Sequence, residues 1–243
     1  MTSRTIGTHP PPPARRPFYA DAWLYFLLGL GVTLAGFWPS FFSRPAANPV
    51  PHTLHGVVAT GWLVLLVTQA GLMRLRRPAW HRTLGKASYV LLPALIVTGA
   101  WVLHLMLAGQ SRLPAGMARM LGFIDLVTLL FLAAAFALAI ANRRDVQLHA
   151  RWMATTLLIV LPPALGRLMF VLFGAIPMPR ALALAYAMLV AVCAVLVYVD
   201  WRGGRLRAPY LAAGATLTGT YAALGPIAGS PQWAAVAGWI GGR

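Results

Sequence analysis

Long apolar runs alternate with short polar segments along most of the chain. The seven runs cover approximately residues 20–42, 53–73, 88–108, 117–141, 152–174, 181–198 and 210–229. Each is near the ~20 residues that an α-helix needs to cross a bilayer. Backbone groups in lipid must form hydrogen bonds within the chain, and the sequence lacks the alternating short strands of a barrel. The pattern therefore predicts an all-α bundle of seven transmembrane spans over residues 20–229.

Three features modify this simple pattern. The run 152–174 contains Pro162 and Pro163, which predict a break or kink because proline interrupts the hydrogen bonding of a helix. The helix of the third span is expected to begin near Trp80, and the run 210–229 is weaker and rich in Gly and Thr. Outside the bundle, residues 1–19 predict a disordered cytoplasmic tail that is rich in Pro and Arg. Residues 230–243 predict a tail that lies along the membrane interface.

The loops carry basic residues unequally. If the N-terminus is cytoplasmic, the inner side of a seven-span protein holds fourteen Lys and Arg residues and the outer side holds five. Cytoplasmic loops of membrane proteins carry an excess of Lys and Arg. The distribution therefore predicts a cytoplasmic N-terminus and an external C-terminus in a bacterial-type inner membrane. A six-span protein would place the C-terminus inside instead.

The composition supports a membrane protein and excludes several other classes. The chain is 59% hydrophobic and only 10% charged, which is too little charge to cover a soluble domain of 243 residues. The net charge of +16 comes from Arg clusters at the ends of apolar runs, so topology and anionic lipids explain it better than nucleic acid does. Because the chain has no Glu, carboxylate-rich di-iron sites are not expected. The single cysteine, Cys193, excludes an internal disulfide.

Two histidines lie at the cytoplasmic ends of predicted spans. His81 precedes the third span and His149 precedes the fifth. Two neutral imidazoles from neighbouring helices can supply both axial ligands of a b-type haem, and Arg82 and Arg151 would then stand near its propionates. Another transition metal, or two interfacial histidines that bond only to helix ends, are the alternatives. A structural zinc site is a weaker interpretation because it needs four ligands.

A second group of polar residues lies within the spans or near their outer ends. His55 and Gln69 share one face of the second span with Trp62, at a spacing of seven residues. Asp125 and Arg167 lie at similar depths in consecutive antiparallel spans, which predicts an ion pair. This pair is either structural or part of an outward-facing polar cavity.

The remaining histidines lie near the outer face. His52 and His55 are three residues apart and, with His104, would suit one metal or one proton-handling site. However, a separation of twenty-three residues from His81 places His104 on a different face of the third helix if His81 points inward. His104 alone is better explained as an interfacial residue.

Several motifs together resemble a bacterial family of multi-pass membrane proteins that is described only as a domain of unknown function. The resembling residues are His55-Gly56 with Gln69, His81-Arg82-x-x-Gly85-x-x-x-Tyr89, Asp145-x-x-x-His149-x-Arg151-Trp152-Met153, and Arg167. They span about residues 52–167, roughly half of the chain. The resemblance implies a helical membrane core, with His55, His81, His149 and Arg167 as pattern positions, and it implies no activity. The layout of histidines at helix ends is also similar in style to di-haem cytochrome b oxidoreductases, although the spacings differ.

These observations favour an integral membrane redox protein that binds haem or another metal. His81 and His149 are the expected ligands, and His55 is a further candidate metal ligand. A cofactor-free binding or transport module is the first alternative, with a polar cavity around Arg167, Asp125 and His55. Gln69 is also expected to line this cavity. A structural membrane subunit is the second. Membrane lipids are expected partners. Two further candidate partners are a quinone or other small molecule and a second copy of the chain.

Overall fold

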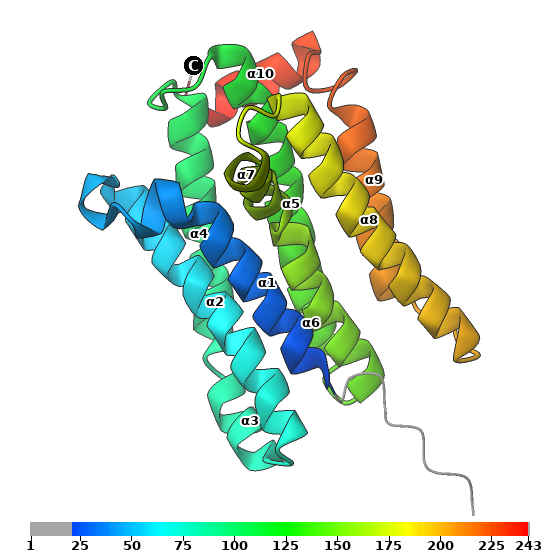
Figure 1. Cartoon of the computed structure of the whole chain (residues 1–243). Helices are drawn as coiled ribbons and strands as arrows, with labels where there is room; N and C mark the ends of the chain where they lie inside the picture. The colour runs from blue at the N-terminus through cyan, green and yellow to red at the C-terminus, as the bar shows by residue number, and fades with distance from the viewer. Residues whose placement is uncertain (1–20, 243) are drawn as a thin grey trace, which may run out of the picture.

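Helices that run up and down the long axis of the molecule build the structure (Figure 1), a computed structural model that describes residues 21–242. The predicted tail 1–19 lies outside the described residues. The long helices are α1 (Ala22–Phe37), α2 (Val50–Arg74), α4 (Ser88–Leu107), α5 (Ala115–Ala141), α6 (Val146–Val160), α7 (Pro162–Phe173), α8 (Met178–Arg202) and α9 (Ala208–Ala223). Shorter elements are the π-helical turn η2 (Trp38–Phe42), the 3-10 turn η3 (Pro45–Ala47), α3 (Pro78–Gly85) and α10 (Pro231–Ile240). The predicted all-α class is confirmed for the described residues.

Several of these helices are long and apolar enough to cross a membrane. Five candidate spans are the helices α2, α4, α5 and α8 and the continuous segment formed by α1 and η2. The bent pair of α6 and α7 forms a sixth candidate if the two helices are counted as one span. The last predicted span is the exception, because α9 has only 16 residues. At 1.5 Å per residue its helix is about 24 Å long, shorter than the ~30 Å hydrocarbon core. The helices are therefore those of a multi-pass membrane protein with five or six spans of standard length.

The predicted interruption between Trp152 and Gly174 is confirmed. Helices α6 and α7 meet at Leu161 with a bend of 47°. Pro162 and Pro163 open α7, and neither has the N–H that would continue the hydrogen bonding of α6. The helix expected from Trp80 begins at Pro78 instead, and two residues separate this helix, α3, from α4.

The side chains are distributed as in a protein surrounded by lipid. Trp62, Leu92, Leu132 and Leu217 are almost fully buried between the helices. Large apolar side chains also cover the lateral surface, where Leu28, Val97, Leu130 and Val195 are each at least 60% exposed. Apolar side chains that face outward along the whole length of a bundle match a hydrocarbon solvent rather than water.

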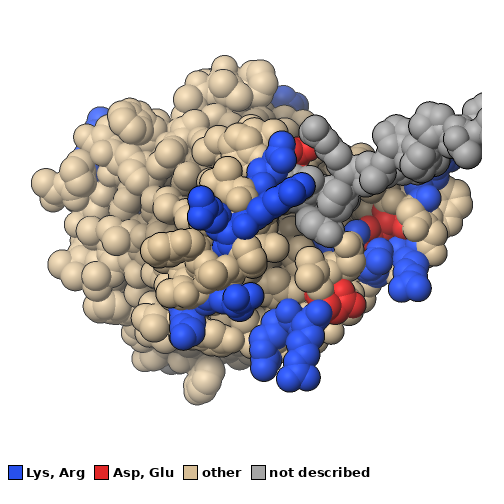
Figure 2. Space-filling model, turned by 90° about the horizontal axis from the view of Figure 1, so that it is seen from below, with Lys and Arg blue, Asp and Glu red and all other residues tan. Residues whose placement is uncertain are grey.

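Charged side chains gather at one end of the bundle, called the basic end below. Figure 2 views this end and shows Lys and Arg side chains around a few Asp side chains. Helix ends and connections here carry eleven of the described basic residues: Arg74, Arg76, Arg77, Arg82, Lys86, Arg143, Arg144, Arg151, Arg202, Arg205 and Arg207. The opposite end carries four: Arg44, Arg112, Arg119 and Arg180. Helix α1 starts at the basic end, where Asp21 lies 3.6 Å from Arg74.

Candidate functional site

Two histidines from separate helices meet at the basic end. The ring centroids of His81 on α3 and His149 on α6 are 6.4 Å apart, and the ring planes are inclined by 86°. The predicted approach of these two imidazoles is therefore found, and we call the pair the two-histidine site.

The sequence before α6 fixes the position of His149. Asp145 is the N-cap of this helix, and its carboxylate accepts hydrogen bonds from the main-chain N–H groups of Gln147 (2.8 Å) and Leu148 (3.0 Å). His149 Nδ1 lies 2.9 Å from the carbonyl oxygen of Ala139 in the last turn of α5. Because a carbonyl only accepts, Nδ1 carries the proton. In neutral His149 the lone pair is therefore on Nε2.

The polar contacts of Gln69 fix the position of His81. The buried Gln69 side chain reaches from α2 to α3. With its amide oriented by its partners, it donates to Nδ1 (2.5 Å) and to the main-chain oxygen (3.0 Å) of His81 and accepts from the N–H of Gly85 (3.0 Å). Because Nδ1 accepts in this arrangement, neutral His81 carries its proton on Nε2, and metal binding through Nε2 requires the other tautomer, in which Nδ1 donates to the carbonyl of Gln69. His81 Nδ1 also lies 3.4 Å from the main-chain carbonyl of Gln69. Gln69 thus supports the two-histidine site and does not line the cavity near Arg167 in which the sequence analysis placed it.

The surroundings of His81 favour its neutral form. Burial lowers the pKa of His81 below the ordinary 6.5, and the charges of His149 and Arg82 lower it further. The hydrogen bond to the carbonyl of Gln69 opposes this decrease. A lowered pKa leaves His81 uncharged at neutral pH, which is the form of imidazole that binds metals.

The geometry suits a centre with two protein ligands. Two imidazoles that bind one metal from opposite sides at ~2.0–2.1 Å per nitrogen have ring centroids roughly 6 Å apart, and the observed separation of 6.4 Å is compatible with this arrangement. Within residues 21–242, no group of three or more His, Cys, Asp or Glu side chains is placed to hold a metal ion. A closed four-ligand zinc site therefore does not fit. A haem fits the donor set, because its macrocycle supplies the other four ligands.

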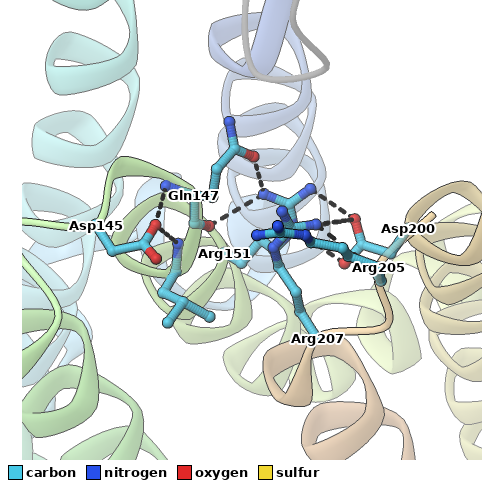
Figure 3. A network of polar contacts seen from close by, with 7 residues as sticks. Asp145, Gln147, Arg151, Asp200, Arg205 and Arg207 are labelled. Carbon is cyan, nitrogen blue, oxygen red and sulfur yellow. Dashed lines mark hydrogen bonds and ion pairs between the residues drawn. The ribbon is translucent and has the colours of Figure 1, made fainter. Parts of the chain in front are cut away.

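The two arginines expected beside the histidines differ in their surroundings. Arg82 follows His81 on α3 and is exposed at the basic end. Arg151 is only 5% exposed. Its Nε and Nη2 atoms donate to the carboxylate of Asp200 at 2.9 and 2.6 Å (Figure 3). Arg151 is therefore not available to a haem propionate as an exposed cation, because Asp200 on α8 pairs with it inside the bundle.

The network around Arg151 joins three helices. Figure 3 shows Gln147 on one side of the guanidinium and Asp200 on the other. Arg151 Nη1 lies 3.1 Å from the carbonyl oxygen of Gln147, and Arg207 before α9 lies 3.9 Å from Asp200. Asp200 was not among the predicted site residues. The available signal was an acid in the last turn of a long apolar run, next to a basic loop.

The outer histidines do not assemble into one site. His55 Nδ1 lies 3.2 Å from the hydroxyl of Thr98 on α4. His104 Nδ1 instead donates to the carbonyl of Ile240 on α10 at 2.7 Å. His52 lies exposed on the first turn of α2. His55 is also far from the two-histidine site, since fourteen residues of helix place it about 21 Å from Gln69 along α2.

The expected ion pair between Asp125 and Arg167 is not formed. No oxygen of Asp125 lies within 4.0 Å of Arg167, and Asp125 makes no hydrogen bond to the described residues. Arg167 Nη1 donates instead to the carbonyl of Pro163 (3.2 Å), and the guanidinium lies 4.5 Å from the centroid of the Phe37 ring. The prediction was wrong because Arg167 folds back along α7 and stacks on α1.

The fold and the site together define an all-α, multi-pass membrane protein with a two-histidine site at its basic end. No protein-family model, curated protein or solved structure matches the chain. The family resemblance carried by the motifs stays a prediction.

Proposed function

We propose that the protein is an integral membrane redox protein whose centre, a b-type haem or another transition metal, binds to His81 and His149. The observation that carries this proposal is the 6.4 Å approach of two imidazoles from separate helices. The hydrogen bond from His149 Nδ1 to Ala139 supports it, because metal-binding histidines usually donate their other ring N–H to a carbonyl or carboxylate.

Each residue of the site has a distinct task in this proposal. His81 and His149 would each provide one imidazole nitrogen to the centre, and Gln69 and the carbonyl of Ala139 hold the two rings in place. Arg82 is the exposed cation suited to a propionate. When bound, a haem would supply one-electron transfer, and the two histidines and their hydrogen bonds would tune its potential.

The proposal includes seven spans, with the N-terminus in the cytoplasm of a bacterial cell and the basic end at the inner face. Eleven against four described basic residues support this orientation. Packing supports α9 as the seventh span despite its length. Arg207, its N-cap, lies beside Asp200 at the basic end, and α10, which follows it, bonds to α4 and α5 at the opposite end.

An absorption spectrum and an elemental analysis of the purified protein test the cofactor. We expect a Soret band whose reduced-minus-oxidised spectrum is that of a six-coordinate b-type haem, or one bound transition metal per chain. His81→Ala and His149→Ala should each lose it. His104→Ala is the matched control, because His104 also bonds a carbonyl through Nδ1 but lies at the other end. A protein that is colourless and free of metal, or one whose signal survives both substitutions, would refute the proposal.

A further inference from the structure

A hollow of about 310 Å³ opens on the side of the bundle between α1 and α7, away from the basic end. The two helices touch beside it at Gly36, where a Cβ atom would overlap the main-chain carbonyl of Ala164. The wider π-helical turn η2 then follows, with Pro39 in its first turn. Turns of this kind are frequent at functional sites. The hollow is lined by Gly36, Pro39, Ser40, Arg167, Phe170 and Val171.

Arg167 is the charged side chain of this hollow. Its guanidinium stacks on Phe37 and bonds to the carbonyl of Pro163 in its own helix. Asp125 on α5 acts on it electrostatically but lies beyond 4.0 Å, so the two side chains form no direct ion pair. A cation at membrane depth without a direct counter-charge is costly, and such residues commonly mark ligand sites.

The chemistry of the lining defines the ligand. A guanidinium offers a planar fork of donors that matches the two oxygens of a carboxylate or phosphate, and an anion also neutralises its charge. Phe170 and Val171 give the hollow an apolar side. The volume holds a headgroup and the first methylenes of a chain, and the rest of the chain would remain in lipid.

We propose that this hollow binds the acidic headgroup of an anionic membrane amphiphile. Arg167 pairs with the carboxylate or phosphate, and the apolar tail lies against Phe170 and Val171. A neutral amphiphile would offer Arg167 no counter-charge within direct contact. The hollow lies apart from His81 and His149, so this proposal does not depend on a bound haem or metal.

Thermal unfolding of the full chain in a neutral maltoside detergent tests the proposal with oleate and oleyl alcohol as matched probes. We expect oleate to raise the unfolding temperature in a saturable way and oleyl alcohol to have no such effect. Arg167→Gln should raise the oleate concentration that gives the half-maximal temperature shift at least tenfold. Arg180→Gln, which removes an exposed arginine at the same end, should respond like the parent.

A second variant keeps the test valid if Arg167→Gln does not fold. Ser40→Trp fills the hollow but retains Arg167, and it should also lose the oleate response. Dihexanoyl phosphatidylglycerol compared with dihexanoyl phosphatidylcholine identifies the headgroup. A response to phosphatidylglycerol alone that requires Arg167 assigns a phosphate, and a response to oleate alone assigns a carboxylate. Equal responses to oleate and oleyl alcohol, or parental binding in both hollow variants, would overturn the proposal.

Discussion

At the scale of single residues, the buried ion pair between Arg151 and Asp200 is the strongest polar feature of the described chain. The two side chains are 6% and 2% exposed, and Nη2 of Arg151 lies 2.6 Å from the carboxylate. Each side chain stabilises the buried charge of the other, because a buried charge without its partner is costly. The pair links α6 to α8, and α6 also carries His149.

Replacement of Asp200 by Asn should therefore destabilise the protein strongly. We expect a loss of about 3–5 kcal/mol in the free energy of unfolding, because Arg151 would keep a buried charge without a counter-ion. Unfolding in mixed micelles by titration with dodecyl sulfate measures this free energy.

Two further variants make the measurement specific to the buried pair. Asp21→Asn breaks an ion pair whose side chains are 48% and 47% exposed. It should cost no more than about 1 kcal/mol. The double replacement Arg151→Met with Asp200→Leu should restore most of the stability, since it removes both charges. A loss below about 1 kcal/mol for Asp200→Asn would contradict this account of the pair.

At the scale of helices, the stability of α6 depends on the cap at its first turn. Asp145→Ala removes the carboxylate that accepts from the N–H groups of Gln147 and Leu148. The expected cost is about 0.5–2 kcal/mol in the same unfolding measurement. Asp145→Asn should lose much less stability, because its side-chain oxygen can still accept hydrogen bonds from these N–H groups. Equal losses for the two variants would show that the charge of Asp145 matters rather than its cap.

The contact between α1 and α7 provides a second test at this scale. A Cβ on Gly36 meets the main-chain oxygen of Ala164, which cannot swing aside as a side chain can. Gly36→Ala should therefore push the helices apart and cost about 1–3 kcal/mol. Gly31, in the same helix, has nothing within 4 Å of an added Cβ. Gly31→Ala should stabilise α1 by about 0.5–1 kcal/mol, and a Gly36→Ala protein of equal stability would contradict the close approach.

The sequence predicted helices and their interruptions better than it predicted side-chain partners. Apolar runs and Pro162-Pro163 are local signals, so six of the seven expected spans, counting α6 with α7 as one, and the bend between α6 and α7 were predicted correctly. Partners depend on which helices are neighbours and on how their ends fold back. The turn after α2 brings His81 to Gln69, and α8 brings Asp200 to Arg151. The spacing of residues within one helix indicates which of them share a face. It does not predict contacts between helices such as those of His81 with Gln69 and of Asp200 with Arg151.

At the scale of the whole molecule, the asymmetry of charge determines how the protein should lie in a membrane. The basic end holds eleven described Lys and Arg residues against four at the other end. It also holds Asp21, Asp145 and Asp200, so local pairing offsets part of this charge. The two-histidine site lies at this end. With the proposed orientation, the metal centre should exchange electrons on the cytoplasmic side, and the Arg167 hollow should face the outer half of the bilayer.

Cysteine labelling in intact bacterial cells tests this arrangement. In a Cys193→Ala background, we expect a membrane-impermeant maleimide to label Gln110→Cys, in the connection between α4 and α5, from outside. Thr83→Cys on α3 should react only after permeabilisation, because the excess of Arg and Lys keeps that end in the cytoplasm. Gln232→Cys on α10 should react from outside, since α10 contacts the same end of α4 as this connection. Labelling of Gln232→Cys only after permeabilisation would show that α9 does not cross, and external labelling of Thr83→Cys would reverse the orientation.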